Sequence, residues 1–291
     1  MIGDMMQVLS AKKSGIFAGA GLFVLLLAAG GCSSLRLAPQ TLPERQEASF
    51  LAMGTKWTIA MSGVPSRREF TVLKDKILSF ALYYDMTFSG WTEESELRRL
   101  ERAGLDKTQS PSELFFEGLR LSQEAFGETG GVFDITVGAI QWRALPAAVG
   151  LSSLDIDLER KTFRFRKDPK RLTFDGIAKG MALGEMAAYL IEQGVKGFVI
   201  DAGGGNLVER TSSGELRFVS RSRVFKAGSD GDRHVWNPAD ARYVQEKSEI
   251  VCTVEDTTRS RLIYWGALSD AFSTARLLSR DFQLPPICEE I

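Results

Sequence analysis

Hydrophobic positions recur at helical spacing in the stretch that follows Leu172, LTFDGIAKGMALGEMAAYLIEQGVKGFVIDAGGGN. The pattern predicts a helix that ends at Gly194, where a left-handed C-cap is expected. A short buried strand over 197–200 then leads into a glycine-rich loop at 203–205. The helix start at 176–178 and this loop both offer free backbone N–H groups, which favour an anion such as phosphate. A helix packed on a sheet between two glycine turns explains the same pattern.

Capping signals and alternation predict the other elements. Ser66 and Glu69 form a capping box that opens a helix, and a second box at 110–113 places proline at the first helical position of another. Alternating apolar residues predict a strand over 50–61, further strands over 215–219 and 250–254, and a hairpin within 151–174. A final helix is expected over 269–278.

Residues 1–31 are predicted to be a signal peptide. Two lysines precede an apolar run over 15–31, and Cys32 then follows Ala-Ala-Gly-Gly as in a bacterial lipobox, although Ala29 stands where leucine is usual. Lipidation of Cys32 would let residues 32–48 tether a domain over 49–291 to a membrane. An uncleaved anchor helix is the alternative. Both alternatives place the domain in the cell envelope, facing the periplasm or the exterior.

Composition adds limits rather than a function. A chain of 291 residues with a 44% hydrophobic share has room for one large domain or two small ones. A net charge of −1 argues against nucleic acid as the main partner. In an exported domain Cys252 and Cys288 could form a disulfide, but their spacing does not show proximity, and two buried or terminal thiols are favoured.

Three positions suggest chemistry. Lys179 lies in the first turn of the predicted helix, where a cation is misplaced without an anionic partner, which suggests a phosphate-bearing ligand. Asp270 and Thr274 share a helix face, and two such oxygens suit Mg²⁺, which keeps waters and takes substrate phosphate oxygens. An Asp270 that only N-caps the last helix is the alternative. A nicotinamide site is disfavoured, because the glycine loop lacks the G-x-G-x-x-G opening of a helix.

An ordered set of motifs resembles the FAD:protein FMN transferases, the ApbE family, over nearly all of the mature chain. The motifs are Met53-Gly-Thr55, Ser89-Gly-Trp91 with Ser95-Glu-Leu97, Gly131-Val-Phe-Asp134, Phe174-Asp-Gly-Ile-Ala-Lys-Gly-Met181, Val199-Ile-Asp-Ala-Gly-Gly-Gly-Asn206, His234-Val-Trp-Asn-Pro238 and 269–278. The resemblance implies an α+β fold of T-fold-like architecture, with mixed or antiparallel sheets and packed helices.

The resemblance also implies a flavin site. Met53 would lie against the flavin, Trp91 would stack on the isoalloxazine, and the turn of Val132, Phe133 and Asp134 would contact FAD. Thr173 stands where the family commonly has a FAD-contacting Asp. Each has a structural alternative: Met53 as core, Trp91 as a lid over core, and Asp134 as the cap of the next element.

The implied reaction is attack by an acceptor protein's threonine hydroxyl on the FMN phosphorus of FAD, with release of AMP. The backbone carbonyl of Gly176 would join Asp270 and Thr274 around Mg²⁺, and Lys179 would add positive charge. His234, the single histidine, would position or deprotonate the hydroxyl. The acceptor would be a protein such as a flavin-carrying subunit of a redox-driven ion pump. A degenerate flavin-binding lipoprotein and an enzyme that hydrolyses FAD to FMN and AMP are the alternatives.

Two further features depart from the family pattern. Asn237 replaces the Asp of the histidine motif, and only 27 residues separate Asn206 from His234, where the family has a longer segment. The shortening concerns the adenosine end of the implied FAD site.

Overall fold

The computed structural model describes residues 45–138, 150–167, 171–223, 236–237, 242–243 and 247–291. The predicted signal peptide, most of the predicted tether and His234 lie outside these residues. None of the helices in the described part of the chain is long and apolar enough to span a membrane.

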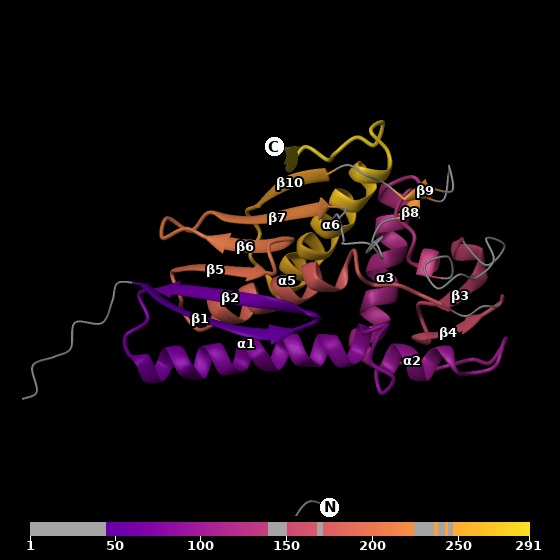
Figure 1. The fold of residues 1–291 in the computed structure, drawn as a ribbon, viewed down its shortest axis with the longest axis horizontal. Coiled ribbons are helices and arrows are strands. Elements are labelled where there is room, and N and C mark those ends of the chain that lie inside the picture. The colour runs from indigo at the N-terminus through magenta and orange to yellow at the C-terminus, as the bar shows by residue number, and fades with distance from the viewer. Residues whose placement is uncertain (1–44, 139–149, 168–170, 224–235, 238–241, 244–246) are drawn as a thin grey trace, which may run out of the picture. The chain divides into compact units, whose positions relative to one another are not determined.

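A seven-stranded antiparallel sheet organises the fold (Figure 1). Its order is β1-β2-β5-β6-β7-β10-β11, formed by β1 (Arg45–Ala52), β2 (Thr55–Ser62), β5 (Gly197–Ala202), β6 (Asn206–Arg210), β7 (Leu216–Arg223), β10 (Lys247–Val254) and β11 (Cys288–Glu290). Two small sheets pair β3 (Leu154–Asp157) with β4 (Thr162–Phe165), and β8 (Trp236–Asn237) with β9 (Arg242–Tyr243). The expected α+β class with an antiparallel sheet and packed helices is confirmed.

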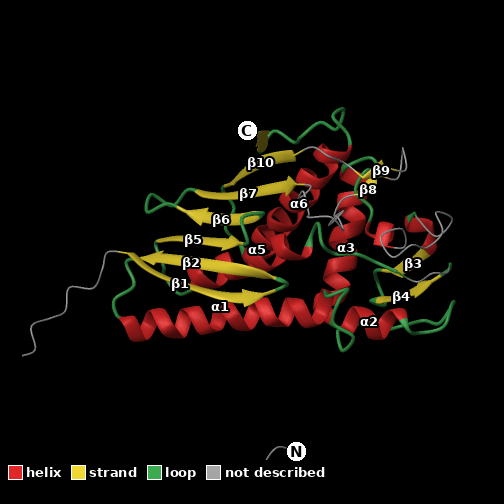
Figure 2. Ribbon diagram, in the orientation of Figure 1, coloured by secondary structure: helices red, strands yellow, loops and turns green. Residues whose placement is uncertain are grey.

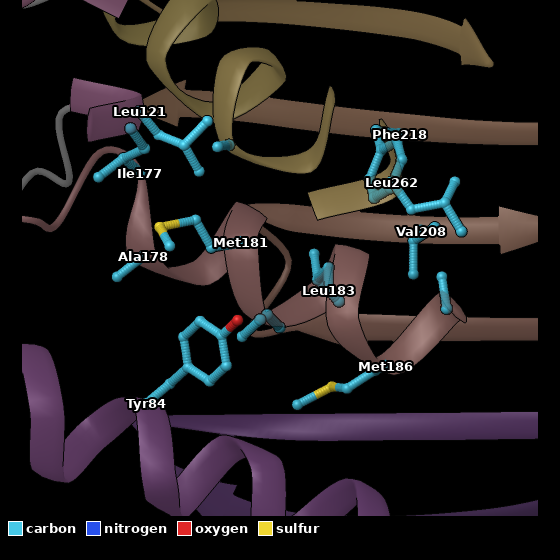
Figure 3. Packing of buried hydrophobic residues seen from close by; sticks show 14 of the residues in the cluster. Tyr84, Leu121, Ile177, Ala178, Met181, Leu183, Met186, Val208, Phe218 and Leu262 are labelled. Carbon is cyan, nitrogen blue, oxygen red and sulfur yellow. The ribbon is translucent and has the colours of Figure 1, made fainter. Parts of the chain in front are cut away.

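Helices α5 (Ala178–Glu192) and α6 (Arg259–Leu278) pack side by side against the sheet, and α1 (Arg67–Phe88) lies beside β1 and α5 (Figure 2). Two further helices, α2 (Glu96–Glu101) and α3 (Glu113–Glu128), and two 3₁₀ turns, η1 (Ile135–Val137) and η3 (Leu151–Ser153), complete the described helical elements. Figure 3 shows the core where Tyr84 of α1 points toward α5, and where Phe218 of β7 and Leu262 of α6 lie beside each other.

The predicted caps of α1 and α5 are confirmed. Ser66 caps α1 by accepting a hydrogen bond from the Glu69 amide at 3.1 Å. Gly194 adopts φ +77° after α5, and the amide of Val195 reaches back to the carbonyl of Leu190 at 3.0 Å, which is the Schellman arrangement. These local signals fix the start of α1 and the end of α5.

Four boundaries differ from the expectation. The strand predicted over 50–61 is a hairpin, because Met53 and Gly54 both adopt positive φ and form a two-residue turn. β1 begins at Arg45, so residues 45–48 belong to the sheet and not to a tether. Ser112, not Ser110, caps α3, since Glu96 accepts a hydrogen bond from the Ser112 amide at 2.7 Å. α6 begins at Arg259, ten residues before the predicted start.

The preference for two separate thiols is wrong. Cys252 and Cys288 face each other in β10 and β11 and form a disulfide. Sequence spacing could not show this, because the pairing depends on the return of the chain after α6 to the edge of the sheet.

Candidate active site

Glycines let α5 and α6 cross at very short range. A Cβ atom on Gly180 would lie 2.0 Å from the carbonyl oxygen of Gly266, and one on Gly266 would lie 2.2 Å from the carbonyl oxygen of Gly180. One turn further along α5, a Cβ on Gly184 would lie 2.3 Å from the carbonyl oxygen of Leu262. The two backbones therefore touch, and this contact brings the middle of α6 to the first turn of α5.

Asp270 occupies that junction. Its side chain is 4% exposed, and its Oδ2 accepts a hydrogen bond from the Gly180 amide at 3.2 Å. Burial raises the pKa of Asp270 to about 6, although the positive charge of Lys179 and the Gly180 amide both favour the ionised form. Lys179, the cation predicted in the first turn of α5, thus has an anionic neighbour within the chain, Asp270. Asp270 lies in the interior of α6, whose N-cap is Thr258, so the capping alternative is wrong.

Thr274 and Gly176 meet on the same side of α6. A Cβ on Gly176 would lie 3.0 Å from Thr274 Oγ1 and 3.1 Å from a ring carbon of Phe133, so only glycine lets this backbone approach so closely. Thr274 Oγ1 donates to the Asp270 carbonyl at 3.3 Å and lies 3.2 Å from the hydroxyl of Ser222. The three positions predicted to hold a metal therefore converge at the start of α5.

The donor set fits a magnesium ion. A buried carboxylate, a hydroxyl and a backbone carbonyl beside it are hard oxygen ligands, which Mg²⁺ prefers, and they leave positions for water and phosphate oxygens. Among the residues that the structure describes, no three His, Cys, Asp or Glu side chains cluster as an all-side-chain metal site. A cation at Asp270 would thus depend on the backbone, the hydroxyl and a phosphate-bearing substrate.

Met53 and Trp91 lie near the C-terminal end of α1. The Met53 amide donates to the Asp85 carboxylate at 3.1 Å, and Met53 has φ +48°, a conformation that side chains other than glycine rarely adopt. Trp91 follows α1 and is 75% exposed. Trp91 is therefore not a lid over core, and both residues keep their predicted flavin-binding role as a prediction.

Aromatic packing connects this end of α1 with the metal-binding segment. Phe88, at the last position of α1, packs on Phe174 with ring centroids 4.7 Å apart, two residues before Gly176. The C-terminal end of α1, near the candidate flavin contacts, is thus joined by an aromatic contact to the segment that leads to Gly176.

The turn before η1 shows the capping role that was the structural alternative for Asp134. Phe133 is buried against Gly176, while Asp134 caps η1 by accepting hydrogen bonds from the Thr136 amide at 2.8 Å and hydroxyl at 2.7 Å. Burial raises the pKa of Asp134. The capping role of Asp134 is confirmed, and its contact with FAD, like that of the half-exposed Val132, stays a prediction.

Thr173 and the glycine loop at 203–205 make contacts that the fold alone explains. The Thr173 amide donates to the carbonyl of Ile135 at 2.8 Å, which places Thr173 beside η1. The glycine loop is the β5–β6 hairpin turn: a Cβ on Gly203 would lie 2.0 Å from Thr55 Oγ1, and the Gly204 amide donates to Asp201 at 2.5 Å. Of the two predicted phosphate sites, the start of α5 has the positive charge of Lys179. The glycine loop has a structural reason for its glycines, the close contact with Thr55.

Sequence reasoning missed a buried ion cluster that holds the segment before Gly176. Glu101, the last residue of α2, is 4% exposed and accepts hydrogen bonds from the Arg98 guanidinium at 2.6 Å, the Arg171 guanidinium at 2.6 Å and the Leu172 amide at 2.8 Å. No local pattern marks Glu101, since its partner at 171 is distant in sequence. The Gly180-x-x-x-Gly184 spacing, by contrast, was a visible signal for the close helix contact.

Comparison with known proteins finds relatives of this chain by sequence. A model of the ApbE family matches residues 53–215, over half of the chain. A FAD:protein FMN transferase of Klebsiella pneumoniae (strain 342) is 26% identical over 184 residues, 56% of this chain and 52% of that protein. The chain thus spans about half the length of this curated relative.

Solved structures agree on the fold. The flavin transferase ApbE from Vibrio cholerae superposes with a TM-score of 0.66 at 17% identity, covering 81% of this chain and 87% of that one. The apo flavinyl transferase ApbE from Pseudomonas stutzeri gives 0.64 at 16% identity, covering 80% and 85%. Together with the family match, these findings show that the chain belongs to the ApbE family of flavin transferases.

Proposed function

We propose that this protein transfers FMN from FAD to a threonine of an acceptor protein in a Mg²⁺-dependent reaction that releases AMP. The observation that carries the proposal is the buried Asp270 carboxylate at the start of α5, beside Lys179 and one turn from Thr274 and Gly176. A buried carboxylate needs counter-charge, and Lys179 offsets only part of the cost, since burial still raises the pKa of Asp270 to about 6. A bound cation would offset the rest.

The chain's own residues would divide the work as follows. Asp270, Thr274 and the Gly176 carbonyl hold the ion, which neutralises charge on the diphosphate. Lys179 adds positive charge at the same place. Met53 and Trp91 position the flavin, and the buried Phe133 supports the Gly176 backbone. His234 accepts the proton of the threonine hydroxyl as its oxygen bonds to the FMN phosphorus and the bond to the AMP oxygen breaks.

We further propose that the protein acts as a lipoprotein of the cell envelope, anchored through Cys32, on acceptors that face the periplasm or the exterior. The charged n-region, the apolar run and the lipobox-like Ala-Ala-Gly-Gly-Cys support this. Radiolabelled palmitate incorporation that is lost in Cys32→Ala tests it. Equal labelling of the variant would contradict the anchor.

The activity is tested by mixing residues 33–291 with FAD, Mg²⁺ and a peptide that carries the threonine acceptor motif of the family. Mass spectrometry of the peptide is expected to show an FMN adduct that EDTA abolishes and that Asp270→Ala loses. Thr71→Ala, on the exposed face of α1, is the matched control and should keep full yield.

The other outcomes identify the alternative functions. FMN and AMP without an adduct on the peptide or on the natural acceptor would replace the transferase with a FAD hydrolase. FAD that binds and stays intact would replace it with a flavin-binding lipoprotein. Unchanged turnover in Asp270→Ala would overturn the metal assignment.

A further inference from the structure

A row of hydrogen-bonding side chains, which we call the polar seam, lies between the sheet and the C-terminal half of α6. Ser220 and Ser222 are two residues apart in β7 and therefore point to the same face. The Ser220 hydroxyl lies 3.1 Å from that of Ser269, and the Ser222 hydroxyl lies 2.8 Å from that of Ser273. These pairs flank Asp270 along the helix, so the sheet beneath the candidate metal site is built from hydrogen-bonding groups.

Asn206 belongs to this seam. It begins β6 opposite Ser220 in the β6–β7 register, which places it under the α6 turn that carries Ser269 and Asp270. Its side chain is 4% exposed, yet its Nδ2 has no hydrogen-bond partner among the residues that the structure describes. A buried polar group without a partner is rare in native proteins and usually marks a site completed by something else.

The position of Asn206, opposite Ser220 and below the α6 turn of Ser269 and Asp270, indicates what completes it. The amide favours the ionised form of Asp270 and so lowers the pKa of that carboxyl, against the larger effect of burial. The Gly180 amide already donates to Asp270 Oδ2 at 3.2 Å. The Asn206 amide is a second N–H donor near this carboxylate, and it makes no hydrogen bond within the described residues.

We propose that Asn206 is a positioning residue for the divalent cation: its side-chain amide donates to the Asp270 carboxylate and, with the Gly180 amide, holds it in the orientation that binds the ion. The inference rests on the proposed metal site. Groups that hydrogen-bond a metal ligand fix its orientation, and their loss typically weakens metal affinity about 10–100-fold. Asn206 itself is not a ligand.

The seam provides a matched control. Ser248 in β10 lies opposite Ser222, is 2% exposed, and its hydroxyl also has no hydrogen-bond partner within the described residues. Ser248 is thus a second buried, unsatisfied polar group of the same sheet, and within the described part of the chain no hydrogen bond connects it with Asp270. Replacing it removes the same kind of group without touching the carboxylate.

The test measures Mn²⁺ binding to residues 33–291 through the loss of the free-ion EPR signal, with thermal unfolding of the cation-free proteins in parallel. Mn²⁺ is used because it takes the same oxygen ligands as Mg²⁺. Asn206→Leu, of similar volume, is expected to bind Mn²⁺ 10–100-fold more weakly. Its unfolding temperature without cation should be unchanged or higher, since an unsatisfied polar group is gone. Ser248→Ala should bind as the unsubstituted protein does.

Wild-type affinity in Asn206→Leu would overturn the inference, as would equal losses in Asn206→Leu and Ser248→Ala. If the leucine variant does not fold, Asn206→Ser replaces it, because serine keeps a hydroxyl donor. An intermediate loss of Mn²⁺ affinity is then expected. Wild-type Mn²⁺ affinity in Asn206→Ser would equally overturn the inference. Failure of the proposed metal site is a separate result, because Asp270→Ala would then bind Mn²⁺ as well as the unsubstituted protein does.

Discussion

The two halves of α6 meet their neighbours in opposite ways. The N-terminal half touches α5 backbone to backbone through Gly266 and Leu262, with apolar side chains around the contact. The C-terminal half faces β7 through paired hydroxyls and carries a buried carboxylate at its start. The N-terminal half makes apolar and backbone contacts, and the C-terminal half adds buried hydrogen-bonding groups to its buried apolar side chains.

The contrast separates stability from function. Close packing at the glycines fixes where α6 lies, and the polar half uses that fixed position to place Asp270 at the first turn of α5. A buried carboxylate whose pKa is raised to about 6 makes the cation-free fold less stable. Natural proteins keep such costs at functional sites. Substitutions in the two halves should therefore have opposite consequences.

Gly180→Ala should have the largest effect. The new Cβ would lie 2.0 Å from the Gly266 carbonyl oxygen, so the helices must separate, and we expect a loss of more than about 3 kcal/mol in the free energy of unfolding. Urea unfolding followed by circular dichroism measures it. Gly127→Ala in α3 is the control: nothing lies within 4 Å of its Cβ, and a gain of roughly 0.5–1 kcal/mol is expected. Equal effects at both positions would contradict the close contact.

Loss of the disulfide should increase local opening more in the C-terminal half of α6, the polar half, than in the N-terminal half. Cys252 and Cys288 close a loop of 36 residues in sequence separation that contains α6, and Arg276 of the polar half also binds Glu290 in β11 at 2.8 Å. We expect the double variant Cys252→Ala/Cys288→Ala to lose about 3 kcal/mol. Hydrogen exchange should rise more in 269–278 than in 260–268. A uniform rise along α6 would show that the two halves do not differ in this way.

Asp270→Asn should stabilise the cation-free protein, in contrast to the glycine substitution. The pKa of Asp270 is about 6 in the folded chain against 3.8 as its ordinary value, so the folded state holds the proton more tightly. The contribution of this group to stability is therefore present below about pH 4 and lost as the pH rises through 6. The variant should match the unsubstituted protein near pH 4 and exceed it by up to about 3 kcal/mol at pH 7.

Urea unfolding at the two pH values, in EDTA, measures this difference. Adding Mg²⁺ should narrow it, because only the unsubstituted protein gains stability by binding the ion. A variant that is less stable at pH 7, or a difference that does not change with pH, would contradict the assignment of a strained buried carboxylate.

Trp91→Ala should have the smallest effect on stability, below about 0.5 kcal/mol, because the side chain is 75% exposed. FAD affinity, measured by flavin fluorescence quenching, should nevertheless fall several-fold, since base-like rings stack on exposed aromatic side chains. Leu51→Ala, at 77% exposure, serves as the control for loss of an exposed apolar group. Equal FAD affinity in both variants would remove Trp91 from the flavin site.

Local signals in the sequence predicted the elements that carry the site. The cap at Ser66, the helix of α5 and its stop at Gly194 follow from spacing and residue type within one or two turns. The shared helix face of Asp270 and Thr274 follows from i, i+4 spacing in the same way. The family resemblance then added Gly176, whose approach to Thr274 no spacing could reveal.

The errors lie where distant segments decide the outcome. Ser112 rather than Ser110 caps α3, and the Ser112 amide donates a hydrogen bond to the carboxylate of Glu96 in another helix. Met53 lies in the β1–β2 turn, and its amide donates to the carboxylate of Asp85, which is distant in sequence. The disulfide, the Glu101 cluster and the Asn206–Asp270 approach all join residues more than thirty positions apart. Such contacts depend on the packed sheet and helices, and no window of sequence contains them.

The most direct test of the account is a crystal structure of residues 33–291 grown with Mn²⁺ and an FAD analogue that cannot be cleaved, with anomalous data collected at the manganese edge. We expect an anomalous peak bounded by Asp270, Thr274 and the Gly176 carbonyl, with a phosphate oxygen completing the ion's ligands. A strong peak elsewhere, or bound diphosphate with no peak beside Asp270, would contradict it.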